Sequence, residues 1–173
     1  MPALTALESR YSIGNLPPES RTNGFISIQH SAEWFAAAVA SDGVHVAEIA
    51  GDLVGFIVVT EMPHRSETKP GSILRAMADL AEVTSFRGRP LAGQRVACRG
   101  AVLIAEAARG QGIYTAFNEA TREAYRERFD VGVLFVAADN PRSLHTSTAK
   151  LGATSLALFE AGGRRYHFLA YAF

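Results

Sequence analysis

The sequence is poor in the residues that build covalent or metal-held frameworks. Among its 173 residues only Cys98 is a cysteine, so neither an internal disulfide nor a cysteine metal cluster can form. Lysine occurs only at Lys69 and Lys150, and 17 basic residues balance 17 acidic ones to a formal net charge of zero. A chain without net charge has no global field that would draw it to nucleic acid or to an acidic membrane. We therefore expect neither partner.

Long apolar runs are also missing. No run reaches the ~18 residues that a membrane span requires, and the N-terminus lacks a basic stretch followed by an apolar core. Both absences predict a cytoplasmic protein. The histidines other than His145 show no ligand spacing, so we expect no metal site. The length suits a single domain over residues 1–173, with enough chain to bury a core.

Hydrophobic patterning favours the α/β class. Two continuously apolar runs, 54–59 and 131–138, are typical of central strands that are buried on both faces. Ser31 predicts the N-cap of a helix, and Gly51-Asp52 predicts a hairpin turn. The order is strand, helix, two strands, an insert, strand, helix, strand, helix and a closing hairpin. Strands are predicted at 24–28, 44–50, 53–60, 96–105, 131–138, 153–159 and 166–173, and the clearest helix at 113–129.

The insert, residues 61–95, is the least regular stretch and is rich in proline and glycine. Within it, Ser72 predicts the cap of a short helix that carries Ile73, Leu74, Met77 and Leu80 on one face. A connection this long is often functional or mobile, and here it is a candidate lid over a substrate site. A plain surface insertion explains it equally well.

The most informative run is Arg109-Gly110-Gln111-Gly112-Ile113, which lies between a predicted strand and a predicted helix. Its two glycines allow backbone N–H groups to converge on an anion, and the helix adds the positive end of its dipole. A phosphate-binding P-loop would need a lysine after the glycines, and this stretch has none. A dinucleotide fingerprint would need a third glycine. The run therefore predicts a phosphate cradle of a different kind.

Two motifs in order resemble the GCN5-related N-acetyltransferase (GNAT) superfamily. The first is the strand ending at Leu103-Ile104-Ala105 with the Arg-x-x-Gly run that begins at Arg109. The second is the strand 133–138, the turn 140–143 and the ending 150–153. Tyr114 stands where the family usually has glycine or alanine, and Ala153 replaces the usual aromatic residue. The resemblance extends from about residue 24 to residue 173.

This resemblance implies a fold and a co-substrate. The fold would be a mixed, mostly antiparallel central sheet of about six to seven strands, flanked by helices, with a central splayed pair of parallel strands. The co-substrate would be acetyl-CoA, with its pyrophosphate on the N–H groups of residues 111–114 and its pantetheine arm along residues 103–105. The implied cofactor-binding residues are Leu103, Ile104, Ala105, Arg109, Gly110, Gln111, Gly112, Ile113, Tyr114, Asn140 and Ser143. Asn140-Pro141 is also typical of a simple helix N-cap, and the two roles are compatible.

Catalytic residues are harder to choose. Amide formation from a thioester needs a neutral amine and a proton for the departing thiolate. The family often supplies that proton from a tyrosine after the turn that begins at Asn140, and here no tyrosine is present. His145 is the candidate acid by its chemistry, with Ser147 and Tyr114 as alternatives, although a surface or packing role explains His145 and Ser147 better. Glu61, at the end of a central strand, is the candidate base, although an ordinary loop carboxylate explains it too. We expect Cys98 to be a buried core thiol.

The resemblance thus implies an acyltransferase that moves an acetyl group from acetyl-CoA to an amine of a small molecule or a peptide, by direct attack on the thioester. The alternative is a catalytically weak or inactive domain that binds acyl-CoA as a sensor. The apolar, aromatic strand at 166–173 leaves a homodimer open, although an interior strand would show the same pattern.

Overall fold

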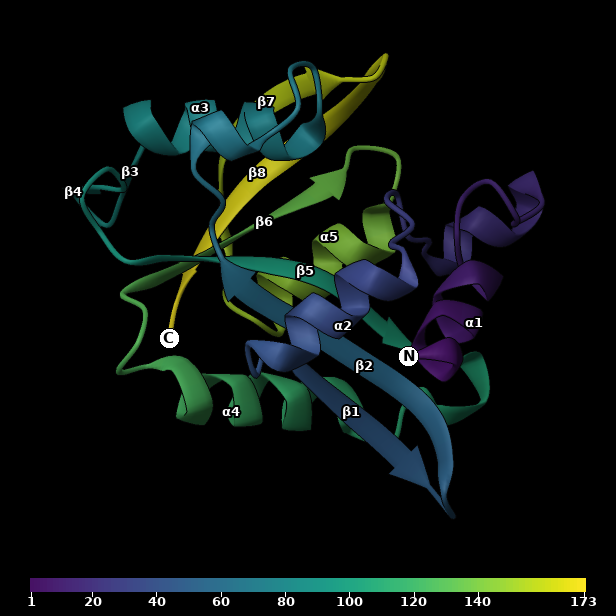
Figure 1. Cartoon of the computed structure of the whole chain (residues 1–173). Helices are drawn as coiled ribbons and strands as arrows, with labels where there is room; N and C mark the ends of the chain where they lie inside the picture. The colour runs from purple at the N-terminus through teal and green to yellow at the C-terminus, as the bar shows by residue number, and fades with distance from the viewer. The chain divides into compact units, whose positions relative to one another are not determined.

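The computed structural model describes all residues, 1–173, and groups them into two compact units. Unit 1 comprises Met1–Thr60 and Arg99–Ala124, and unit 2 comprises Glu61–Cys98 and Tyr125–Phe173. Six strands form one hydrogen-bonded sheet in the order β1-β2-β5-β6-β8-β7, and Figure 1 labels its elements. Two very short strands, β3 (Ser85–Phe86) and β4 (Arg89–Pro90), form a separate hairpin.

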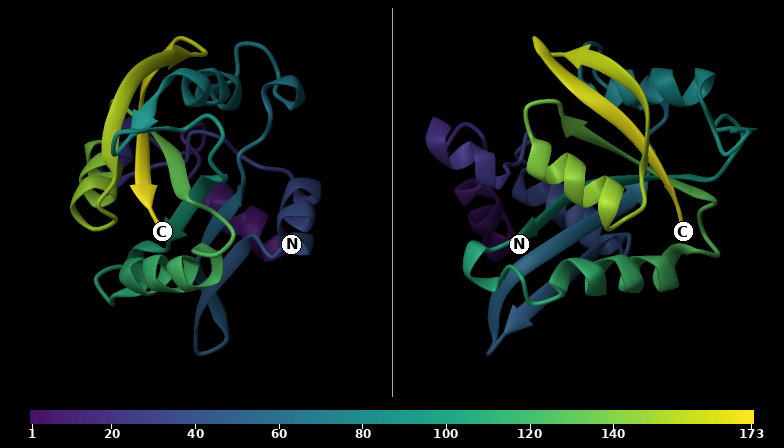
Figure 2. Two further views of the ribbon diagram at one scale, coloured as in Figure 1. Left: turned by 90° about the vertical axis from the view of Figure 1, so that its left-hand side faces the viewer. Right: turned by 180° about the vertical axis from the view of Figure 1, so that it is seen from behind.

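Unit 1 is built on the hairpin of β1 (Val44–Ile49) and β2 (Asp52–Glu61), which pair antiparallel. Helix α2 (Ala32–Ala40) lies on one face of this hairpin and α4 (Ile113–Tyr125) on the opposite face, as the front and rear views show (Figures 1 and 2). The N-terminal helix α1 (Pro2–Arg10) lies against α2. Short 3-10 turns at Pro18–Asn23 and Glu106–Ala108 complete the unit.

The core of unit 1 forms because apolar residues of four elements, α1, α2, β2 and β5, meet at helical and strand spacing. Phe35 of α2 is fully buried and its ring meets that of Phe56 of β2 edge to face, with 5.4 Å between the centroids. As predicted, Ser31 begins α2, and its hydroxyl accepts a hydrogen bond from the Trp34 N–H at 3.2 Å. The buried cluster comprises Leu4, Leu7, Phe35, Ala38, Phe56, Val58 and Leu103.

Unit 2 is built on β6 (Val131–Ala137), β7 (Thr154–Ala161) and β8 (Arg164–Ala172). Strand β8 lies between the other two and pairs antiparallel with both. The first residues of β5 (Val96–Ile104) pair parallel with β6, from Val96 opposite Val131 to Cys98 opposite Val133. The apolar pattern of the C-terminal strand is thus accounted for by an interior place in the sheet, and a homodimer remains a prediction.

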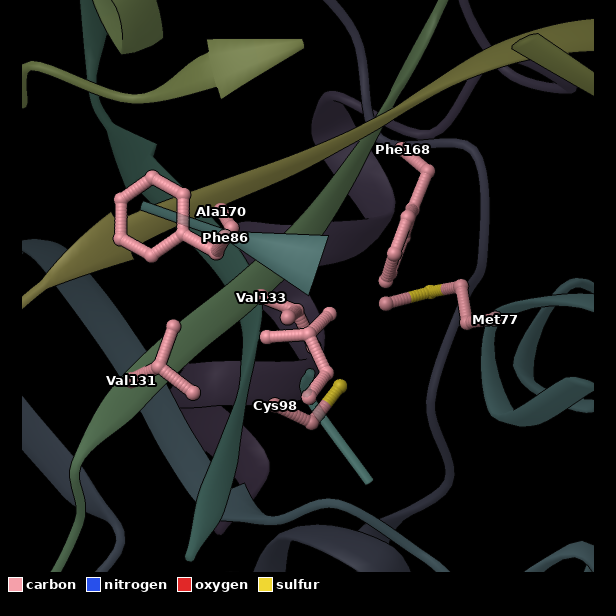
Figure 3. Packing of buried hydrophobic residues seen from close by; sticks show 8 residues of the cluster. Met77, Phe86, Cys98, Val131, Val133, Phe168 and Ala170 are labelled. Carbon is pink, nitrogen blue, oxygen red and sulfur yellow. The ribbon is translucent and has the colours of Figure 1, made fainter. Parts of the chain in front are cut away.

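Two helices cover the two faces of the β6–β8–β7 layer. Helix α3 (Ile73–Val83) places the fully buried Met77 against alternate residues of β6 and β8, as Figure 3 shows. Helix α5 (Pro141–Ala149) covers the other face, where its Leu144 packs against the buried cluster that contains Leu134, Leu169 and, just after the helix, Leu151. The first cluster comprises Met77, Phe86, Leu91, Cys98, Val131, Val133, Phe168 and Ala170.

The expected fold class is confirmed. The sheet is mixed, mostly antiparallel and flanked by helices, and its one parallel pair is β5–β6. The strand expected at 24–28 is wrong, because only a single bridge joins Ser12 to Ile26 there. The helix expected to reach residue 129 ends at Tyr125. No helix combines the length and the apolar character that crossing a membrane requires.

The insert is more than a loop. Ser72 caps α3 as predicted, because its hydroxyl accepts a hydrogen bond from the Arg75 N–H at 3.2 Å. Met77 of this helix is fully buried, so the middle of residues 61–95 supplies a core layer of unit 2 rather than a plain surface insertion. A short 3-10 turn at Arg65–Glu67 precedes the helix. The role of the insert as a lid stays a prediction.

Candidate functional site

The start of α4 in unit 1 has the geometry of an anion cradle. The Ala116 N–H donates to the Gly112 carbonyl at 3.0 Å, which makes Gly112 the residue that begins the helical hydrogen-bond ladder. The N–H groups of residues 113–115 precede the first rung of that ladder and have no acceptor within the helix. As a glycine, Gly112 has no side chain that could cap them. These donors, together with the helix dipole, favour an anion.

The two glycines of the predicted motif hold the loop open. Gly110 and Gly112 have φ angles of 80° and 81°, in the left-handed region that other residues rarely adopt. A Cβ added to either would meet no atom within 4 Å, so the space above both residues is empty of protein. An anion could therefore approach the backbone of Gly110 and Gly112 closely.

Arg109 is held by the protein itself. Its Nε donates to the Ile104 carbonyl at 3.1 Å, and its Nη1 donates to the Asn23 carbonyl at 3.2 Å. Its guanidinium also lies 5.5 Å from the centre of the Tyr11 ring. Arg109 thus ties the cradle loop to the end of β5 and to the N-terminal segment. Gln111 makes a longer contact with the Ala107 carbonyl, at 3.4 Å.

Tyr114, the departure from the family motif, has a clear partner. The guanidinium of Arg99 lies 5.5 Å from the centre of its ring and donates from Nη2 to the Asn118 side-chain oxygen at 2.8 Å. Tyr114 and Asn118 lie one turn apart on the same face of α4, so Arg99 of β5 holds both. Arg99 is 1% exposed, and sequence reasoning missed it, because a lone arginine inside an apolar strand carries no pattern.

The predicted pantetheine strand, residues 103–105, contacts neighbouring segments through both side chains and backbone. Leu103 is buried in the core of unit 1. The Ala105 N–H donates to the Val54 carbonyl at 2.7 Å, and the Ile104 carbonyl accepts from Arg109. Close packing of the backbones also explains Gly55, where an added Cβ would lie 2.8 Å from the Leu103 carbonyl oxygen.

The second predicted motif, in unit 2, forms the start of α5. Asn140 is 3% exposed, and its side-chain oxygen accepts a hydrogen bond from the Ser143 N–H at 3.1 Å. Pro141 occupies the first turn, where a missing N–H costs nothing. The Asn140 N–H donates to the Ala137 carbonyl at 2.9 Å, which fixes the turn after β6. The structure therefore gives Asn140 a capping role, and its predicted contact with the co-substrate remains a prediction.

The predicted catalytic side chains of unit 2 are both exposed. Glu61 lies at the end of β2, and His145 lies on the surface of α5. Of the weaker alternatives, Ser147 is 4% exposed. Cys98 is a buried core thiol, as expected, and burial raises its pKa to about 12. No group of three or more His, Cys, Asp or Glu side chains is arranged to hold a metal ion.

One polar cluster of unit 1 has no counterpart in the sequence prediction. Glu8 of α1 is fully buried and binds His30 through two hydrogen bonds of 2.7 Å, one from the His30 backbone and one with the ring. The ring of His30 stacks on that of Trp34, with 3.7 Å between the centroids. The two residues lie 22 positions apart, so no local motif joins them. The only signal in the sequence is an acidic residue beside Leu7 on the apolar face of α1.

Comparison by sequence finds no match, either to a protein-family model or to a curated protein. Comparison with solved structures does find similar chains. The ribosomal-protein-alanine N-acetyltransferase from Brucella melitensis superposes with a TM-score of 0.61 at 18% identity, over 99% of this chain and 93% of that one. A GNAT-family acetyltransferase from Streptococcus pneumoniae gives a TM-score of 0.61 at 15% identity, over 99% and 92%.

A chain of the NatC complex, solved with Gag peptide and CoA, is similar as well. Its TM-score is 0.60 at 14% identity, over 98% of this chain and 90% of that one. These likenesses cover nearly the whole of each chain, and they agree with the two sequence motifs. The chain therefore has the fold of the GCN5-related N-acetyltransferases, the superfamily that its sequence resembles.

Proposed function

We propose that this protein is an N-acetyltransferase that transfers an acetyl group from acetyl-CoA to an amine. The observation that carries the proposal is the start of α4, where a glycine without a capping side chain begins the helix and the first N–H groups have no acceptor within it. The GNAT fold and the Arg-x-x-Gly motif at the same place support the assignment of the anion as the pyrophosphate of coenzyme A.

Each part of the cradle then has a task. The N–H groups of residues 113–115 donate to phosphate oxygens, and the helix dipole stabilises the charge. Arg109 keeps the loop in place through its two carbonyl contacts, and Arg99 holds Tyr114 against the sheet side of α4. The bound co-substrate supplies the activated acyl group as a thioester. Positioning of the two substrates provides much of the rate in such transfers, so a cradle that fixes the co-substrate contributes to the rate without reacting.

The acceptor in this proposal is an amine of a small molecule or a peptide. Two of the similar structures favour trying peptides first, since one is a ribosomal-protein-alanine N-acetyltransferase and the other was solved with Gag peptide and CoA. We also propose that the protein works in the cytoplasm and without a metal ion.

The proposal is tested by coenzyme A release. The purified protein is mixed with acetyl-CoA and a panel of peptide N-termini and small amines, and the free thiol is measured with a chromogenic disulfide. The only protein thiol, Cys98, does not interfere, because it is buried and its pKa is raised to about 12. We expect release that depends on the amine.

The outcomes separate enzyme from binding domain. Binding of acetyl-CoA without release for any amine would support the alternative of a catalytically weak acyl-CoA sensor. This alternative is favoured by the exposure of Glu61 and His145, because neither candidate side chain is enclosed in a site. Failure to bind coenzyme A at all would contradict both readings.

A further inference from the structure

The Glu8–His30 pair of unit 1 has the geometry of an acid–base device. Glu8 Oε2 accepts from the His30 N–H at 2.7 Å, and Glu8 Oε1 lies 2.7 Å from His30 Nδ1. Both carboxylate oxygens therefore serve one histidine. The Glu8 side chain is fully buried, whereas that of His30 retains 14% exposure. The carboxylate is sealed inside the protein, and the imidazole reaches the surface.

Burial of a carboxylate needs an explanation, because an unpaired buried charge is costly. The backbone hydrogen bond alone would tie α1 to the segment before α2. The second bond, between Glu8 Oε1 and His30 Nδ1, is not needed to join the two segments, but it fixes the orientation of the ring and its tautomer. With Glu8 ionised, Nδ1 must donate, which leaves Nε2 as the nitrogen that accepts a proton. This carboxylate–imidazole relation is the one that orients a general base.

Aromatic contacts fix the plane of the ring. His30 stacks on Trp34 with 3.7 Å between the centroids and a 24° angle between the planes. It also meets Phe35 edge to face at 5.9 Å. Since Phe35 is fully buried, the stack stands on the core of unit 1. Such a support holds a catalytic group more rigidly than a surface loop does.

Trp34, on which His30 stacks, lies next to β5, the strand that ends in the predicted pantetheine residues. Trp34 Cη2 lies 3.9 Å from the position that a Cβ would occupy on Gly100 of β5. The same strand continues to residues 103–105, which the family resemblance assigns to the pantetheine arm. His30 and the α4 cradle thus belong to one unit, and Trp34, on which His30 stacks, contacts the strand that precedes the cradle loop.

We infer that His30 is the general base for the acceptor amine and that Glu8 is its positioning residue. The inference rests on the proposed acetyltransferase function. The ammonium group of the acceptor gives one proton to His30 Nε2. The nitrogen lone pair then forms the C–N bond to the acyl carbon, and the C–S bond breaks with its electron pair going to sulfur. The second N–H proton passes to the thiolate, and His30 returns its proton to solvent.

The test measures steady-state rates and coenzyme A binding together. His30→Gln should lower kcat by about 100-fold or more, the usual contribution of a general base, with the KM for acetyl-CoA unchanged. Glu8→Gln keeps one acceptor, for the His30 backbone N–H, but turns an NH2 donor toward Nδ1, so the preferred tautomer is reversed and kcat should fall here as well. Binding of CoA, followed by thermal shift, should persist in both variants.

His167→Gln is the matched control. This histidine of β8 also makes a hydrogen bond through Nδ1, to Ser155 at 3.0 Å, and its loss should leave kcat unchanged. Exogenous imidazole supplies a second readout, because added imidazole should restore part of the activity of His30→Ala. A purely structural tie would not respond in this way.

The outcomes distinguish this inference from the proposed function. Coenzyme A release by the wild type together with an unchanged kcat in His30→Gln would overturn the inference and leave the proposed function standing. A loss of kcat that follows the loss of CoA binding and folding, with no rescue by imidazole, would overturn it too. A wild type that binds CoA but releases none with any amine would overturn both.

Discussion

The two helices that begin at the predicted motifs start in opposite ways. In unit 2, α5 begins at Asn140, whose buried side chain accepts the Ser143 N–H, and Pro141 removes one further donor. In unit 1, α4 begins at Gly112, which has no side chain and an open space above it. The first helix is capped by its own side chain, whereas the second has no side-chain cap at Gly112, and the proposed function assigns its free donors to a phosphate.

Other polar groups of unit 2 are also paired within the chain, unlike the first N–H groups of α4. In unit 2, Arg95 immediately precedes β5 and Asp130 immediately precedes β6. The two residues bind each other through backbone and side-chain contacts, with 2.8 Å between Arg95 Nη2 and Asp130 Oδ1. Arg164 likewise closes on Asp139. A candidate anion site can therefore be recognised by the absence of a cap: glycine occupies the position where a side chain would otherwise accept from the first N–H groups of the helix.

The largest effect is expected when the open cradle is blocked. Gly112→Val places a β-branched side chain at a φ of 81° and into the space above the donors. A ligand at 100 times its dissociation constant stabilises a protein by ~2.7 kcal/mol, and this stabilisation by CoA should vanish in the variant. Thermal unfolding with and without CoA measures it.

Gly152→Val is the matched control for backbone strain. Gly152 follows α5, has a φ of 77° and also has open space around an added Cβ. The variant should lose a similar amount of intrinsic stability but keep the full shift with CoA. Equal loss of the shift in both variants would mean that strain, not the cradle, governs binding.

A smaller effect is expected at Arg109, which positions the loop. Arg109→Met removes two hydrogen bonds to backbone carbonyls, and each is worth about 1 kcal/mol, so the free energy of unfolding should fall by about 1–2 kcal/mol. CoA should bind more weakly but still detectably. Urea unfolding measures the free energy of unfolding, and CoA titration measures the affinity. Complete loss of CoA binding in a folded variant would instead indicate a direct contact with phosphate.

At the closed helix start, Asn140→Ala should cost about 1 kcal/mol of stability through loss of the cap. Asn140→Ser keeps a capping oxygen and should recover most of that stability. Urea unfolding compares the two variants. If Asn140→Ser also weakens CoA binding while its stability is restored, the amide has a second role in the ligand site.

The smallest effect concerns pH. The Arg95 side chain beside Asp130 lowers the pKa of that carboxyl from 3.8 to about 2. Because the folded-state pKa lies below the unfolded one, the stabilisation is present above about pH 4 and is lost as the pH falls toward 2. Asp130→Asn should show a shallower loss of stability across this interval in acid unfolding curves. Parallel curves would show that the pair adds nothing.

Local signals in the sequence predicted much of the fold and little of the chemistry. Ser31 and Ser72 mark helix starts because a cap is a contact within four residues. The run from Arg109 marks the cradle because its glycines act on their own backbone. The strand expected at 24–28 was wrong, since alternation there finds no neighbouring strand with which to form a ladder. Arg99 and the Glu8–His30 pair depend on contacts between distant segments, which no local pattern encodes.

The central claim, that the start of α4 binds a pyrophosphate, is tested most directly by comparing two ligands. Thermal unfolding of the wild type is measured with CoA and, at the same concentration, with pantetheine, which lacks the pyrophosphate. The account predicts a clear rise of Tm with CoA and little or none with pantetheine. Equal shifts with both ligands, or no shift with CoA, would contradict it.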